Sequence, residues 1–125
     1  MANFFTRAGM AIVSGRAIGA SPSQAEAKFV AWGTGAGAAS ASVTTLSTEA
    51  AEARTSGTGS QVTVTQTNDA HQIVGTITAT GTKTITNAGV FDASATGNLY
   101  VIGDGLSIAL VSGDSIAFTF KLSFA

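Results

Sequence analysis

Ser115-Ile-Ala-Phe-Thr-Phe-Lys-Leu-Ser-Phe124 alternates large apolar side chains with small or polar ones, without a break. Successive side chains of a β-strand point to opposite faces, so the five large apolar residues share one face. That face is committed to a hydrophobic core, and the other face to a polar surface. The stretch therefore predicts a half-buried strand and a mainly β protein.

The same period of two continues through the second half of the chain. Apolar residues alternate with polar ones from Gln61 to Thr65 and from Gln72 to Thr80, and the turn at Asn68-Asp69 makes the two runs antiparallel. Shorter runs bounded by turn signals follow at 82–86, 90–91, 99–102 and 106–110, before the long run at 115–124. Such strands without intervening helices predict an antiparallel β-sandwich with Greek-key or jelly-roll-like connections, formed as a single domain by residues 26–125.

The first half is less regular. Residues 1–25 contain three glycines and Pro22, and we expect an extended N-terminal arm with one strand near Met10–Val13. A strand is expected at Lys28–Trp32, followed by a flexible glycine-rich loop. Val43–Arg54 has apolar residues at helical spacing, after a capping serine and before a glycine. The sequence predicts one short helix there.

The composition favours a protein that assembles with other protein over a freely diffusing enzyme. Only 10% of the 125 residues are charged, against about 25% in ordinary soluble domains. A weakly charged surface suits strands packed beside other protein. The net charge is −1 and the six basic residues are scattered, so no basic stripe indicates nucleic-acid binding. The start lacks a secretory signal pattern and no apolar run is long enough to span a bilayer, which predicts a cytoplasmic protein without a membrane partner.

No catalytic or metal-ligating pattern stands out. His71 is the single histidine, and no nucleophile or acid accompanies it at a known spacing, so we predict no catalytic residue and no enzyme. Asp92, Asp104 and Asp114 follow one another in turns and could converge on calcium, but aspartate is a common turn residue and that interpretation is preferred. We expect no metal and no cofactor.

Four residues near the N-terminal half are predicted to contact other protein chains. Phe4 and Phe5 are adjacent, so on a strand they point to opposite faces and both cannot enter one sheet face. Arg7 follows them in the expected arm. Trp32 ends a predicted strand beside the glycine-rich loop, where it packs in the core or anchors a subunit interface.

Several segments resemble a family of small bacteriophage virion proteins. The element from Ile85 to Asp92, followed by Gly97-Asn-Leu, is also similar to β-domains of phage tail-collar and tail-fibre proteins. The segments that carry the resemblance are Phe29-Val-Ala-Trp-Gly-Thr-Gly, Thr67-Asn-Asp-Ala-His-Gln-Ile-Val-Gly-Thr-Ile, Ile85-Thr-Asn-Ala-Gly-Val-Phe-Asp and Val111-Ser-Gly-Asp-Ser-Ile-Ala-Phe-Thr-Phe.

The resemblance implies a capsid decoration, or cement, protein that is assembled in the host cytoplasm and resides on the capsid surface of the virion. Its implied partners are the major capsid protein and neighbouring copies of itself, as a homotrimer. Phe4, Phe5, Arg7 and Trp32 would then make these contacts. The alternatives are a phage tail adaptor, fibre or baseplate module, and a carbohydrate-binding β-sandwich that uses Trp32 and Tyr100.

Overall fold

The computed structural model describes residues 2–18 and 26–124. Over these residues the chain forms ten strands and one helix, so the mainly β prediction is confirmed. In chain order the elements are β1 (Ala2–Phe5), α1 (Arg7–Ala17), β2 (Phe29–Gly33), β3 (Thr55–Ser56), β4 (Thr58–Val62), β5 (Ala70–Thr78), β6 (Lys83–Ile85), β7 (Asn87–Phe91), β8 (Leu99–Asp104), β9 (Ile108–Leu110) and β10 (Ser115–Ser123).

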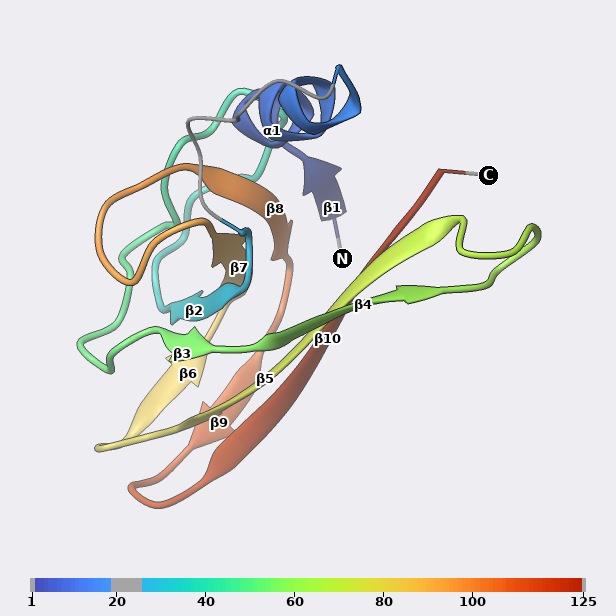
Figure 1. The fold of residues 1–125 in the computed structure, drawn as a ribbon. Coiled ribbons are helices and arrows are strands. Elements are labelled where there is room, and N and C mark those ends of the chain that lie inside the picture. The colour runs from blue at the N-terminus through green and yellow to red at the C-terminus, as the bar shows by residue number, and fades with distance from the viewer. Residues whose placement is uncertain (1, 19–25, 125) are drawn as a thin grey trace.

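The strands form three antiparallel sheets. The largest has the order β1-β8-β7-β2-β3, the second has the order β10-β5-β4, and β6 pairs with β9 in a two-stranded sheet. In Figure 1 the long β4-β5-β10 sheet crosses the molecule, and β2, β7 and β8 lie to one side of it. β10 pairs with β5 along its whole length, from Ser115 opposite Thr78 to Ser123 opposite Ala70, as its alternation predicts.

The main hydrophobic cluster receives side chains from both larger sheets. β2 supplies the buried Val30 and Trp32, β5 supplies Ile73 and Ile77, and β7 supplies Val90. The half-buried apolar face of β10 packs against the same cluster. A core shared by two sheets is what a sandwich requires, and the observed sheets are consistent with that prediction.

A second cluster covers the other face of the five-stranded sheet. Ala31, Phe91, Leu99 and Ile102 point into it, and Leu46 from the long β2–β3 connection is buried with them. All five residues of β7 are consequently buried. The central strands of this sheet are therefore covered on both faces by the chain itself.

The helix predicted for Val43–Arg54 is wrong. Thr48 has a φ of +50°, which no residue of a right-handed helix adopts, and Glu49 forms an isolated bridge with Gly33. The Asn87 side chain fixes a turn at Ser47 and Thr48: its Oδ1 accepts from the Ser47 backbone N–H at 3.1 Å, and its Nδ2 donates to the Ser47 carbonyl at 3.0 Å. Leu46 is buried, but the segment that contains it is not helical.

The extended arm is also wrong for the residues that are described. Ala2–Phe5 is the edge strand β1, paired with β8, and the strand expected near Met10–Val13 lies inside α1. Thr6 begins the helix, since its hydroxyl accepts from the Gly9 N–H at 3.0 Å, and the same hydroxyl is close enough to donate to the carbonyls of Leu99 and Tyr100. The rest of the predicted arm, residues 19–25, lies outside the described residues.

Candidate functional site

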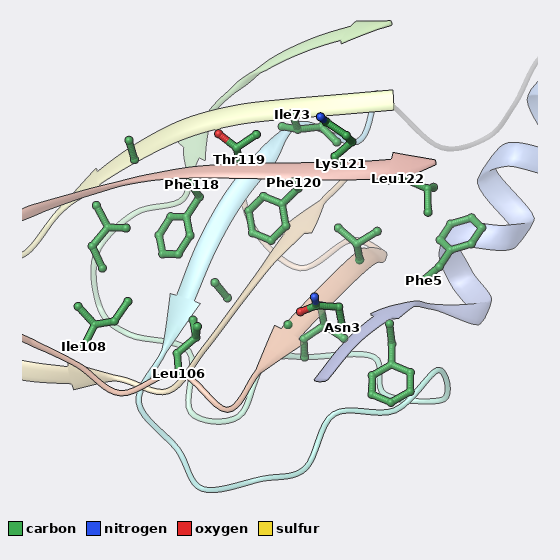
Figure 2. A pocket seen from close by; sticks show the side chains of 17 residues that line it. Asn3, Phe5, Ile73, Leu106, Ile108, Phe118, Thr119, Phe120, Lys121 and Leu122 are labelled. Atoms are coloured by element: carbon green, nitrogen blue, oxygen red, sulfur yellow. The ribbon is translucent and has the colours of Figure 1, made fainter. Parts of the chain in front are cut away.

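An apolar groove of about 440 Å³ opens between β1 and β10. These two strands are the edges of the two larger sheets, so the groove is the place where the shared core reaches the surface. Figure 2 shows its two walls, with β10 along one side and β1 and the β8–β9 segment along the other. We take this groove as the candidate functional site.

The β10 wall is a row of half-buried apolar side chains. Phe118, Phe120 and Leu122 project from β10 into the groove (Figure 2). The rings of Phe118 and Phe120 stack at 5.9 Å between centroids, and the Phe118 ring meets Trp32 edge to face at 6.2 Å. The inner end of the groove is therefore continuous with the fully buried core.

The opposite wall comes from residues far away in the sequence. Phe5 of β1 packs edge to face on Tyr100 of β8, with ring centroids 5.5 Å apart. Leu106 and Ile108 continue the wall from the β8–β9 segment (Figure 2). Asn3 and Lys121 are among the few polar residues that line the groove. Such a lining fits apolar side chains, because it offers few groups that could orient a polar substrate.

The outer edge of β10 adds a backbone surface to the groove. At the two ends of the β5–β10 ladder, the Ala79 N–H donates to the Asp114 carbonyl and the Phe124 N–H donates to the Asp69 carbonyl. Even-numbered residues of β10 thus bond to β5, and odd-numbered ones direct their N–H and C=O groups outward. Within residues 2–18 and 26–124, β10 pairs with no strand other than β5. An open edge of this length is a template for strand pairing.

Trp32 is a core residue and not an interface anchor, which were the two alternatives for it. Its side chain is 1% exposed in the main cluster, and its Nε1 donates to Glu52 Oε1 at 3.0 Å. The indole is therefore a core residue with a satisfied polar atom.

Phe4 and Phe5 do point to opposite faces, as predicted, but both faces are covered by this chain. Phe5 packs against the main cluster and Phe4 against the second one. Both remain half-buried and both line the groove. Arg7 is exposed in the first turn of α1, and its backbone N–H donates to the Ala41 carbonyl at 2.9 Å. The structure brings Phe4 and Phe5 to the groove, whereas Trp32 lies in the core.

His71 and Tyr100 connect the two larger sheets. His71 Nδ1 lies 3.0 Å from the Tyr100 hydroxyl, and their rings pack edge to face. Burial lowers the pKa of His71, an effect that the nearby Glu26 carboxylate opposes, and burial raises the pKa of Tyr100 to about 12. Both side chains are thus neutral at pH 7, and the pair joins β5 to β8 by a hydrogen bond.

The three turn aspartates act separately as acceptors. Asp92 accepts from the backbone and side chain of Asn98 at 2.7 and 2.9 Å, Asp104 accepts from the Ala39 N–H at 2.6 Å, and Asp114 accepts from the Val111 N–H at 2.9 Å. In the described part of the chain, no group of three or more His, Cys, Asp or Glu residues could hold a metal ion. Asp92 and Asp114 thus accept within their own turns, as predicted, whereas Asp104 ends strand β8 and accepts from a distant segment of the chain.

The carbohydrate alternative loses the aromatic platform proposed for it. Trp32 and Tyr100 are 1% and 2% exposed, so neither ring can stack on a sugar at the surface. Among residues 2–18 and 26–124, no helix has the length and apolar character needed to cross a membrane.

Comparison of the chain with protein-family models, with curated proteins and with solved structures finds no match. The groove, the open strand edge and the resemblance described above are therefore the features that bear on function. The groove has one signal in the sequence, which is the unbroken alternation of β10. The position of β10 at the edge of its sheet has no such signal, because it depends on pairing between distant segments.

Proposed function

We propose that this chain is a structural protein of a bacteriophage virion, and more specifically a capsid decoration protein that binds the outer head surface and stabilises the shell. The observation that carries the proposal is the apolar groove beside the open edge of β10. A chain with this surface is suited to association with other protein, and its low charge agrees with that role. Its proposed partners are the major capsid protein and neighbouring copies of itself.

The segments that resemble phage virion proteins form much of the framework of the fold. They include β2, β7, nearly all of β5 and most of β10, and β2, β5 and β7 together supply half of the buried residues of the main cluster. The resemblance thus supports a shared framework, and the groove adds a surface for assembly. Copies that contact one another on a shell bind it at several points, which strengthens attachment without new contacts to each subunit.

Immunogold labelling of virus particles from the source of this chain tests the proposal. Two antibodies are needed, because one epitope could face the shell. Residues 63–68 and residues 94–97 are exposed in separate loops, outside the groove lining, and offer two such epitopes. Gold spread over the head with either antibody is the expected result.

Gold confined to the tail or its tip would contradict decoration and favour the tail adaptor, fibre or baseplate module. Absence of label from intact particles with both antibodies would contradict a location on the virion surface. If the label is on the head, shells stripped of the protein should open at a lower temperature than shells to which the protein has been added back.

A further inference from the structure

The open edge of β10 is complementary to itself. If a second β10 lies antiparallel to the first with the two Thr119 residues opposite each other, Phe118 faces Phe120 of the other copy and Ile116 faces its Leu122. Residues opposite each other in an antiparallel pair project to the same side of the sheet, so the apolar faces of the two strands coincide. In this register the whole of Ser115–Ser123 overlaps its symmetry mate.

We propose that β10 pairs with β10 of a second copy about a two-fold axis at Thr119, so that two three-stranded sheets become one continuous six-stranded sheet. The inference rests on the copy-to-copy contact of the proposed function, and not on its contact with the shell. It specifies the occupant of the groove mouth, since Phe118 and Phe120 of each copy extend the apolar wall of the other. A two-fold contact of this kind uses the same patch on both copies.

The backbone geometry meets the requirements of this pairing. The outward-directed N–H and C=O groups belong to odd-numbered residues, and the Thr119 register places Ala117 opposite Lys121 and Thr119 opposite Thr119. Neither Ala117, Thr119 nor Lys121 bonds through these groups to another strand in the described part of the chain. β1, the other edge facing the groove, has only four residues, Ala2–Phe5, and offers a shorter ladder.

The charges also permit the two-fold register. Lys121 is the one charged residue within Ser115–Ser123, and a single lysine often protects an edge strand from pairing. In this register, however, Lys121 lies opposite Ala117 of the other copy, and the two lysines are separated along the strands by the Thr119 pair. No like charges are directly opposite, so lysine does not prevent this particular pairing.

The contact area indicates a dimer that depends on concentration. Nine strand residues extend for roughly 30 Å and packed sheets lie about 10 Å apart, so the groove mouth contributes on the order of 300 Å² per copy. Specific interfaces bury about 800 Å² per partner, and the outer face of the strand supplies part of the difference. The pairing should therefore appear as a weak, reversible dimer that forms at high protein concentration.

Charge exchange at positions 117 and 121 tests both the dimer and its register. Ala117→Lys places two like-charged pairs across the dimer, and Ala117→Glu places two opposite-charged pairs there. In its own chain Ala117 lies opposite Thr76 and Lys121 opposite Gln72, both neutral, so the monomer should tolerate each change. Thr76→Lys is the matched control, since it adds the same charge to an exposed position of the neighbouring strand β5.

Sedimentation velocity of the full chain over a range of concentrations is the measurement. We expect a species of twice the 12.4 kDa chain mass. Ala117→Lys should raise the dimer dissociation constant by about two- to thirtyfold, and Ala117→Glu should lower it by a similar factor. The double variant Ala117→Lys with Lys121→Glu should return the constant towards the wild-type value, and Thr76→Lys should leave it unchanged.

A chain that stays monomeric at all concentrations would overturn the proposal. So would a dimer whose dissociation constant does not respond to charge at position 117. A trimer, which the resemblance implies, would overturn it in favour of a ring that joins different edges of successive copies. None of these results bears on where gold labels the virion, so failure of the pairing and failure of the decoration role are distinguishable.

Discussion

Glu52 shows how one buried carboxylate can connect distant parts of this chain. Its side chain is 4% exposed and accepts hydrogen bonds from the Trp32 indole, from the backbone and hydroxyl of Thr80, and from the Lys83 ammonium group. Burial would raise the pKa of Glu52, but the hydrogen bonds from Lys83, Thr80 and Trp32 outweigh burial and hold it well below its ordinary value of 4.5. The carboxylate thus joins β2, the turn after β5, and β6.

Replacing this carboxylate should destabilise the fold. Glu52→Gln leaves the largely buried Lys83 without its counter-charge, and we expect the free energy of unfolding to fall by about 1–3 kcal/mol. Glu26→Gln is the matched control, because Glu26 pairs with Lys28 and the two side chains are 57% and 34% exposed, where such pairs contribute about 0–1 kcal/mol. Urea denaturation followed by tryptophan fluorescence measures both variants. Equal losses in the two would contradict the importance of Glu52.

The same residue predicts a pH dependence. Because the folded-state pKa of Glu52 lies below 4.5, its stabilising contribution is complete above pH 4.5 and is lost as the pH falls further. Urea midpoints of the wild type should therefore fall more steeply between pH 4.5 and pH 3 than those of Glu52→Gln. Parallel curves for the two proteins would show that Glu52 titrates normally in the folded state.

The role of Glu52 could not be predicted from the sequence. The partners of Glu52 lie at positions 32, 80 and 83, and no local spacing joins them. The same lack of a local pattern explains why an interface role was one of the two alternatives for Trp32. A lone tryptophan at a strand end is compatible with a surface anchor until a buried acceptor for its indole is identified.

At the scale of elements, α1 is the clearest departure from prediction. Its sequence contains Gly9 and Gly15, which favoured an extended interpretation, and the β-branched Ile12 and Val13 are also weak helix formers. Helix formation depends instead on the Thr6 cap and on packing of the buried Ile12. The reverse holds for Val43–Arg54, where helical spacing is present but Asn87 fixes a turn at Ser47.

Gly9 sets the distance between α1 and β8. A Cβ atom at this position would clash with the Tyr100 carbonyl and lie 2.7 Å from Phe5 Cε1. We expect Gly9→Ala to lower the free energy of unfolding by about 1–3 kcal/mol, although alanine is the better helix former. Gly81→Ala is the control, because a Cβ there meets nothing within 4 Å, and it should change stability by less than about 0.5 kcal/mol. Thermal unfolding followed by circular dichroism compares the two variants.

β10 could be predicted from sequence because its pattern is local and complete. Five large apolar residues of one parity determine a strand and its inner face, whatever the strand pairs with. The strands that pair with β10 could not be predicted in the same way. Its pairing with β5 joins segments that are distant in the sequence, and the absence of a second neighbour in the described chain depends on the whole fold. The inner face was predictable, and the groove was not.

At the scale of the whole molecule, the N-terminal segment is part of the fold. β1 completes the five-stranded sheet and α1 lies against β8, so residues 2–17 cannot be removed as a detachable arm. Deleting residues 1–17 should expose the edge of β8 and one wall of the groove, lower the melting temperature by several degrees and increase the binding of a hydrophobic dye.

Arg7→Ala provides the control for that deletion, since it changes only an exposed side chain of the same segment. It should leave the melting temperature unchanged. A truncated protein as stable as Arg7→Ala would show that β1 and α1 contribute little to the fold. Shell binding by truncated chains therefore has to be judged together with their stability, whereas Arg7→Ala tests the predicted contact separately.

The pairing of β1 with β8 also has a consequence for biosynthesis. Phe5 lies opposite Val101, so the two partners are made far apart in time. Ribosomes add about 5 to 20 residues per second, which leaves about 5 to 20 seconds between the synthesis of Phe5 and that of its partner. Throughout that interval two adjacent phenylalanines emerge without the strand that covers them. The yield of native protein in the cell then depends on what shields Phe4 and Phe5 until translation has passed β8.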